Sequence, residues 1–219
     1  MPRIARAVAV GYPHHVTQRG NYQQPVFENE EDFSQYKSWL EEYCRKYDLT
    51  MWAYCLMNNH VHFICVPQKN DSLSKTFNTL HMRYSQYFNR KKGSTGHLWQ
   101  GRFFSCILDE RHLHSAVRYI ENNPVRAKIV KRAEEYRWSS ARGHIEKGSD
   151  SLLSGGCHLE EEIKEWEVYL CEKEDNLIVE SIRKNALTGR PCGDERFILT
   201  IEERLGRELK AKPRGRPIK

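Results

Sequence analysis

Two histidines separated by one residue stand in a run that is typical of a β-strand. The run LMNNHVHFICVP, residues 56–67, places His60 and His62 among β-branched and aromatic residues. Successive side chains of a strand alternate between its faces, so both histidines project from one face, with Cα atoms about 7 Å apart. This spacing allows both imidazoles to bind one metal ion. Two polar residues on an open sheet face would produce the same pattern.

A downstream segment, RYIENNPVRAK, predicts a helix that carries further reactive side chains. Tyr119 and Asn123 are four residues apart and therefore share one helical face, at the edge of an apolar stripe. The amide oxygen of Asn123 is a suitable ligand for Mg²⁺ or Mn²⁺. A tyrosine hydroxyl is a weak nucleophile at neutral pH, but a metal-polarised phosphodiester would ease its attack. Alternatively, Tyr119 is simply one of eleven tyrosines, at the edge of the core.

The elements that must position these residues follow a recognisable order. A short strand is expected over residues 14–20 and a helix over 30–47, followed by strands over 50–57 and 60–66 that a tight Asn58-Asn59 turn separates. A second helix begins near Leu73, and a strand follows at 103–108. The order β-α-β-β-α-β predicts an α+β ferredoxin-like sandwich. The Tyr119 helix is added to it and ends before Pro124.

A Gly- and Ser-rich stretch near residue 147 separates this region from an acidic, helical sequence. We therefore expect a catalytic domain over residues 1–147. Residues 148–219 are expected to form a helical C-terminal extension that assists DNA recognition and ends in a basic tail.

The charge distribution indicates a nucleic-acid partner. The chain has a net charge of +6, and residues 81–137 contain twelve Lys and Arg against five Asp and Glu. Residues 158–180 reverse this balance, with two against nine. A surface for a polyanion in the middle of the chain is one interpretation, and merely solvated faces are the other.

The remaining composition narrows the class of protein. Seven scattered cysteines without a C-x-x-C pair exclude a disulfide scaffold and a zinc knuckle. No apolar run approaches the roughly 20 residues of a membrane span, and the N-terminal residues lack the long apolar stretch of a signal peptide. We expect a cytoplasmic protein without a membrane partner.

Together, NNHVHFICVP and YIENNPVRA resemble the HUH-type single-tyrosine transposases, and most closely their REP-associated tyrosine transposase branch. The segments YPHHVTQRGNYQQPVF, HLWQGRFFS and YRWSSARGH match this branch in the same order, so the resemblance covers about residues 10–145.

The resemblance implies a role for each motif residue. His60, His62 and Asn123 would bind a divalent metal, Mg²⁺ or Mn²⁺, although relatives outside the branch have Gln in place of Asn123. Tyr119 would attack a phosphodiester of single-stranded DNA, leaving a 5′-phosphotyrosine and a free 3′-hydroxyl. The implied substrate is a hairpin from a palindromic repeat, and the implied state is a monomer rather than a dimer.

Basic residues are expected to bind the DNA in three groups. One group surrounds the second helix and the Tyr119 helix and would contact backbone phosphates: Arg83, Arg90, Lys91, Lys92, Arg102, Arg118, Arg126 and Lys128. An N-terminal group would read a short sequence beside the hairpin: Arg3, Arg6 and Arg19. In the tail, KPRGRPIK contains Arg214 and Arg216 and resembles an AT-hook, which binds the minor groove of A·T-rich duplex. A disordered solubilising tail is the alternative.

Two other functions fit parts of the sequence. His15-Val16-Thr17 with His60-Val61-His62 distantly resembles the paired motifs of two-histidine RNA ligase-like enzymes, which need no metal. The other alternative is a non-catalytic hairpin-binding regulator derived from a transposase. Replacing Tyr119 by Phe separates it from an enzyme, because a pure binder would retain every activity.

Overall fold

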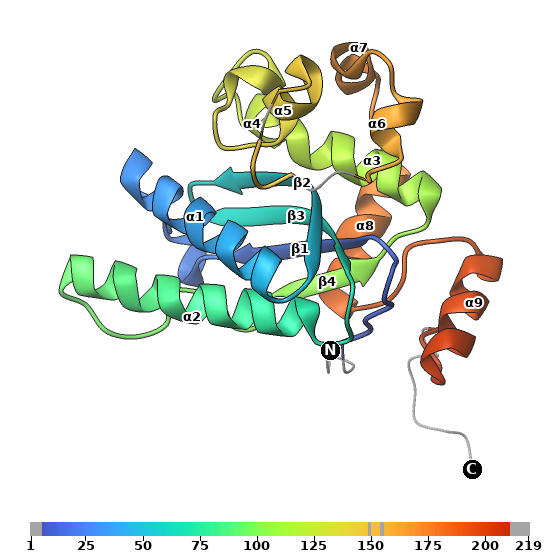
Figure 1. The fold of residues 1–219 in the computed structure, drawn as a ribbon, viewed down its shortest axis with the longest axis horizontal. Coiled ribbons are helices and arrows are strands. Elements are labelled where there is room, and N and C mark those ends of the chain that lie inside the picture. The colour runs from blue at the N-terminus through green and yellow to red at the C-terminus, as the bar shows by residue number, and fades with distance from the viewer. Residues whose placement is uncertain (1–5, 149, 154–155, 211–219) are drawn as a thin grey trace.

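The computed structural model describes residues 6–148, 150–153 and 156–210. Four strands form one antiparallel sheet in the order β2-β3-β1-β4 (Figure 1): β1 (His14–Arg19), β2 (Leu49–Met57), β3 (His60–Pro67) and β4 (Phe104–Ile107). Helix α1 (Glu30–Lys46) connects β1 to β2, and α2 (Ser72–Lys92) connects β3 to β4. The predicted ferredoxin-like α+β sandwich is confirmed.

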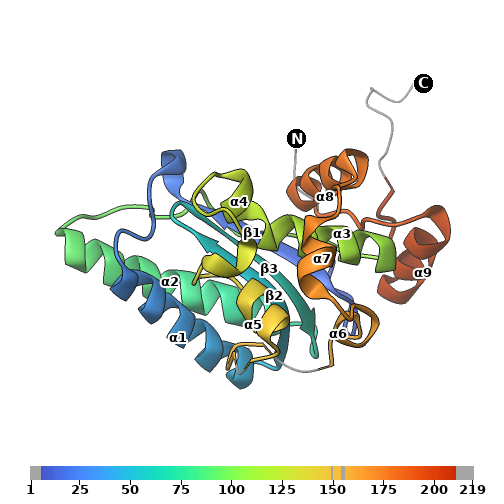
Figure 2. The ribbon, with the colours of Figure 1, turned by 90° about the horizontal axis from the view of Figure 1, so that it is seen from above.

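Helices cover both faces of the sheet (Figure 2). The side chains of β3 alternate between these two faces. Phe63 points toward α2 and stacks on Phe77, with 5.1 Å between the ring centroids. The neighbouring His62 points to the other face and meets Tyr119 of α3 (Glu110–Glu121). Helix α8 (Asn176–Thr188) packs beside α3 on this second face and against β4.

Helices α1 and α3 begin where a side chain can accept a hydrogen bond from a free backbone amide. The Asp109 side chain accepts a hydrogen bond from the His112 amide and caps the N-terminus of α3. Asn29 caps α1 in the same way, through the Asp32 amide.

The Asn58-Asn59 turn joins β2 and β3 as predicted, but neither asparagine has a positive φ angle. Their carbonyls instead accept hydrogen bonds from Val26, Phe27 and Gly20.

The C-terminal extension is helical, as predicted. Its helices besides α8 are α6 (Leu159–Glu162), α7 (Trp166–Cys171) and α9 (Glu195–Leu205), and two short helices precede it, α4 (Asn123–Arg126) and α5 (Ala141–Glu146). The division at residue 147 stays a prediction, although Val16 and Ile182, from either side of it, share one hydrophobic core. No helix among the described residues is long and apolar enough to cross a membrane.

Candidate active site

His60 and His62 form the centre of the candidate site, on the sheet face that α3 and α8 cover. Their ring centroids lie 5.0 Å apart with the rings nearly perpendicular. The Nδ1 atom of His60 lies 2.6 Å from Asn59 Oδ1, so the Asn59 carbonyl fixes the proton of this ring on Nδ1 and leaves Nε2 as a free ligand atom. Burial, with smaller contributions from Arg19 and Arg126, lowers the pKa of His60 to about 4.

A third histidine lies behind His62. In the β1–β3 pairing, His15 is opposite Ile64 and therefore on the same face as His62. The two rings stack at 5.2 Å between centroids, and His15 Nε2 lies 2.9 Å from His62 Nδ1. Burial keeps the pKa of His62 well below its usual value and lowers that of His15 to about 4. All three rings are thus neutral at pH 7, and neutral imidazole is the form that binds metals.

Tyr119 lies against this histidine cluster. Its ring meets that of His62 edge-on at 5.8 Å between centroids, and only 7% of its surface is exposed. Two guanidinium groups flank the tyrosine: Arg126 lies 4.1 Å from the ring centroid and Arg183 lies 5.0 Å from it. Arg183 Nε also donates a hydrogen bond to the Tyr119 hydroxyl at 3.2 Å. Sequence analysis missed Arg183, which comes from α8.

Asn123 begins α4, directly after the turn that ends α3. Its Oδ1 accepts a hydrogen bond of 2.7 Å from Arg126 Nη2, which also donates to the Tyr119 backbone carbonyl at 2.6 Å. The buried Asn123 Nδ2 has no hydrogen-bond partner within the described part of the chain. Asn123 is therefore linked to Tyr119 through Arg126.

The donor set fits a divalent metal. His60 and His62 each have Nδ1 engaged in a hydrogen bond, so that both Nε2 atoms remain available on one face of the sheet. The Asn123 oxygen has a second lone pair beside the one that Arg126 uses. Imidazole nitrogen with amide oxygen suits Mg²⁺ or Mn²⁺.

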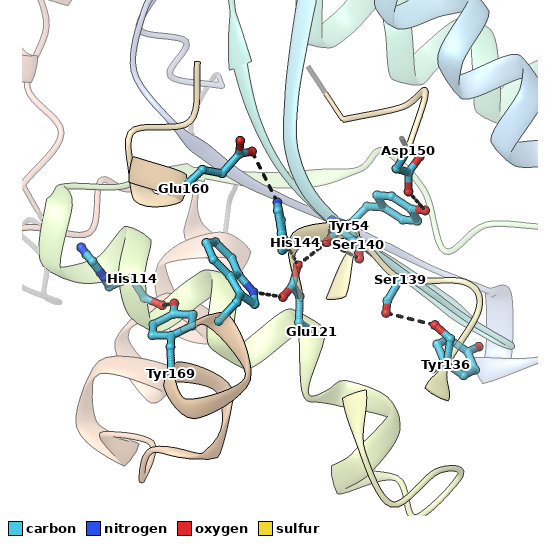
Figure 3. Close-up of polar contacts among 11 residues, drawn as sticks. Tyr54, His114, Glu121, Tyr136, Ser139, Ser140, His144, Asp150, Glu160 and Tyr169 are labelled. Atoms are coloured by element: carbon cyan, nitrogen blue, oxygen red, sulfur yellow. Dashed lines mark hydrogen bonds and ion pairs between the residues drawn. The ribbon is translucent and has the colours of Figure 1, made fainter. Parts of the chain in front are cut away.

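A buried carboxylate fixes the C-terminal end of α3. Glu121 is fully buried and accepts hydrogen bonds from the Ser140 hydroxyl, from His144 Nδ1 at 2.7 Å and from Trp166 Nε1 at 2.8 Å. Figure 3 shows Ser140 and His144 converging on Glu121. Burial opposes the charged form of His144, but the Glu121 and Glu160 carboxylates outweigh it and raise its pKa. This cluster ties α3, the helix that carries Tyr119, to α5 and α7.

The basic residues predicted to bind DNA lie in different places. The α2 group is on the sheet face opposite Tyr119, and three of its members pair with carboxylates: Arg83 with Glu42, Lys91 with Asp32 and Lys92 with Glu28. The α2 residue Arg90 is exposed, as is Arg102 in the loop before β4.

The second set of basic residues lies closer to Tyr119. Arg19 is exposed and pairs in register with His60, and Lys128 is exposed just after α4. Arg118 pairs with Glu172, and Arg126 pairs with Glu174. These two glutamates precede α8 and belong to the acidic segment of residues 158–180, which therefore pairs with two of the predicted DNA-binding arginines.

Four of the predicted residues belong to neither set. Arg6 donates a hydrogen bond of 3.0 Å to the Phe103 carbonyl and covers the Phe103 ring. Arg3, Arg214 and Arg216 lie outside the described residues.

A second cluster of metal-type side chains occurs among the described residues. Glu110, His158 and Glu162 bring their ligand atoms within 4.8 Å of one another on the surface. Exposed acidic clusters of this kind are common without a metal. It offers a control for the histidine site rather than an alternative to it.

The comparisons with known proteins agree with the fold and the motifs. Residues 9–123 match the sequence profile of a family described as IS200-like transposase. A Haemophilus influenzae protein named as a candidate REP-associated tyrosine transposase is 23% identical over 118 residues, which cover 49% of this chain and 67% of that protein.

A solved structure has the same fold. It is a REP-associated tyrosine transposase bound to a REP hairpin, and it aligns with a TM-score of 0.55 and 18% identity. The alignment covers 71% of this chain and 93% of the other. The resemblance seen in the sequence motifs is confirmed.

Proposed function

Because the chain belongs to the IS200-like transposase family, we propose that it is a metal-dependent endonuclease and strand transferase that cleaves single-stranded DNA through Tyr119. The observation that carries this proposal is the contact between Tyr119 and His62, whose ring centroids lie 5.8 Å apart. A potential nucleophile and two potential metal ligands thus meet at one point. Since all three belong to the same chain, we propose that a monomer contains a complete site.

The chemistry balances without an external energy source. A divalent metal held by His60, His62 and Asn123 would polarise the non-bridging oxygens of the scissile phosphate. The Tyr119 hydroxyl oxygen forms a bond to phosphorus while the bond from phosphorus to the 3′-oxygen breaks. The tyrosine proton is balanced by the proton on the released 3′-hydroxyl, and the 5′-phosphate stays on Tyr119. Attack of a 3′-hydroxyl on this phosphotyrosine reverses the step and joins two strands.

The proposed substrate is a single-stranded hairpin from a palindromic repeat. The support comes from the solved relative of the same fold, which is bound to a REP hairpin. In this chain the exposed Arg19 lies opposite His60, where it would contact backbone phosphate next to the site.

Incubation with a labelled hairpin strand, taken from repeats that flank the protein's own gene, tests the proposal. With Mn²⁺, denaturing electrophoresis should show a covalent protein–DNA band that EDTA prevents. Tyr119→Phe should lose this band and still bind the hairpin. A matched control is Tyr47→Phe, because Tyr47 ends α1 on the other side of the sheet.

The non-catalytic regulator remains the second candidate. Tight hairpin binding without any covalent band or cut strand, in Mn²⁺ and in Mg²⁺, would favour it over an enzyme. The two-histidine phosphoesterase receives less support, because His15 is 2% exposed and its Nε2 is bonded to His62.

A further inference from the structure

We infer that Arg183, in the C-terminal extension, is a catalytic residue that binds the nucleophilic oxygen of Tyr119 and the scissile phosphate at the same time. This inference rests on the proposed function. It assigns to α8 a part in the chemistry, beyond recognition of the DNA.

The contact with the reacting atom is direct. Arg183 Nε donates to the Tyr119 hydroxyl oxygen at 3.2 Å, and its guanidinium carbon lies 5.0 Å from the centroid of the same ring. Helix α8 is held in place by its apolar side, where Ile178, Val179, Ile182 and Ala186 are buried. Ile182 immediately precedes Arg183 and is fully buried, so the backbone that carries the guanidinium is anchored in the core.

The charge of Arg183 is available, unlike that of its neighbours. Arg118 and Arg126 are paired with Glu172 and Glu174. Arg183 has no carboxylate partner among residues 6–148, 150–153 and 156–210, and it is exposed. Since only Nε contacts Tyr119, the two terminal nitrogens of the fork can donate to a phosphate oxygen.

This geometry suits the reaction. During attack, negative charge accumulates on the non-bridging oxygens of the phosphate, next to the tyrosine oxygen. A fixed guanidinium at this position stabilises that charge more than it stabilises the ground state. After cleavage, the bridging oxygen of the phosphotyrosine occupies the place of the hydroxyl, so Arg183 contacts the intermediate as well. Arg183 neither donates nor accepts a proton during the reaction.

The test compares Arg183→Ala, Arg183→Lys and Lys184→Ala at a saturating concentration of the labelled hairpin. Lys184 is the matched control, because it is the next residue of α8, exposed and equally charged. We expect Arg183→Ala to slow adduct formation by about 10²- to 10³-fold, the cost of losing one donor to a developing oxyanion. Hairpin affinity should change by less than about tenfold, and Lys184→Ala should cleave at the wild-type rate.

Chemical rescue separates this role from a structural one. Millimolar guanidinium should restore part of the Arg183→Ala rate and leave the wild type unchanged, and Arg183→Lys should retain more activity than Arg183→Ala. Equal rates for wild type and Arg183→Ala, or a slow variant without rescue, would overturn the inference. If the wild-type protein itself forms no adduct, the proposed function fails instead, so the two failures are distinguishable.

Discussion

His15 Nε2 lies 2.9 Å from His62 Nδ1, across two neighbouring strands of the sheet. In the proposed metal site, His62 would bind the metal through Nε2, so its Nδ1 would carry the proton and donate a hydrogen bond to His15 Nε2. His15 would therefore orient the proposed ligand ring and fix its tautomer.

Replacement of His15 by Ala should consequently weaken Mn²⁺ binding by about 10- to 100-fold, as is usual when the partner of a ligating histidine is lost. Titration calorimetry measures the change directly. His14→Gln is the control, because His14 is equally buried but alternates to the other sheet face. Unchanged Mn²⁺ affinity in folded His15→Ala would show that the ring does not support His62.

The proposed metal ligands give a second prediction. His60→Ala and His62→Ala should each abolish measurable Mn²⁺ binding at micromolar protein. Each variant removes one of only three proposed protein ligands. His158→Ala removes the only histidine of the exposed Glu110, His158 and Glu162 cluster and should have no effect. The opposite pattern would place the metal in that surface cluster.

The sequence was sufficient for the fold and for the parts of the site that depend on local geometry. Alternation along one strand placed His60 and His62 on the same face. The four-residue spacing of Tyr119 and Asn123 did not place them on one helix, because α3 ends at Glu121 and Asn123 begins α4. Apolar periodicity located α1, α2 and α3 within a few residues. These features depend on backbone repeats alone.

Contacts between distant segments were not predictable in this way. His15 meets His62 because of the register of β1 against β3, and no pattern in HHVTQRG specifies that register. Arg183 and Tyr119 are 64 residues apart in sequence and meet because α8 packs beside α3. The charge pattern of residues 158–180 did not indicate that Glu172 and Glu174 would pair with Arg118 and Arg126, because ion pairs depend on tertiary position.

These ion pairs yield a third prediction, about DNA affinity. The carboxylates of Glu172 and Glu174 pair with Arg118 and Arg126, so they would compete with the backbone phosphates of the proposed substrate. The double variant Glu172→Gln/Glu174→Gln should bind the hairpin several-fold more tightly at low salt, as measured by fluorescence anisotropy. Glu165→Gln/Glu167→Gln makes the same change in net charge at exposed positions of α7 and its N-terminus. An equal gain in both double variants would indicate net charge as the cause.

Glu121 gives a fourth prediction, about stability. Its removal leaves the His144 and Trp166 donors buried without their carboxylate acceptor, whereas the Ser140 hydroxyl can still donate to the Tyr54 carbonyl. Glu121→Ala should therefore lower the free energy of unfolding by about 3–5 kcal/mol, as for other broken buried pairs. Urea denaturation measures it, and Glu161→Ala on exposed α6 should change it by less than about 0.5 kcal/mol. A loss below about 1 kcal/mol in Glu121→Ala would mean that the cluster does not anchor α3.

The pKa of His144 gives a fifth prediction, about pH. Because Glu121 raises this pKa in the folded protein, folding favours the protonated ring. The resulting stabilisation is complete below the unfolded pKa of about 6.5 and declines as pH rises through the folded value. The difference in unfolding free energy between wild type and His144→Gln should thus be larger at pH 6 than at pH 9. A difference that is constant or grows with pH would contradict this sign.

The most direct test of the account is to locate the covalent bond. The adduct formed with hairpin DNA and Mn²⁺ is digested with nuclease and trypsin, and the peptides are analysed by mass spectrometry. Cleavage after Arg118 and Arg126 releases residues 119–126, YIENNPVR, in which Tyr119 is the only tyrosine. We predict that this peptide carries the mass of a 5′-linked nucleotide on Tyr119. A nucleotide on any other residue, or cleaved DNA without a modified peptide, would contradict the account.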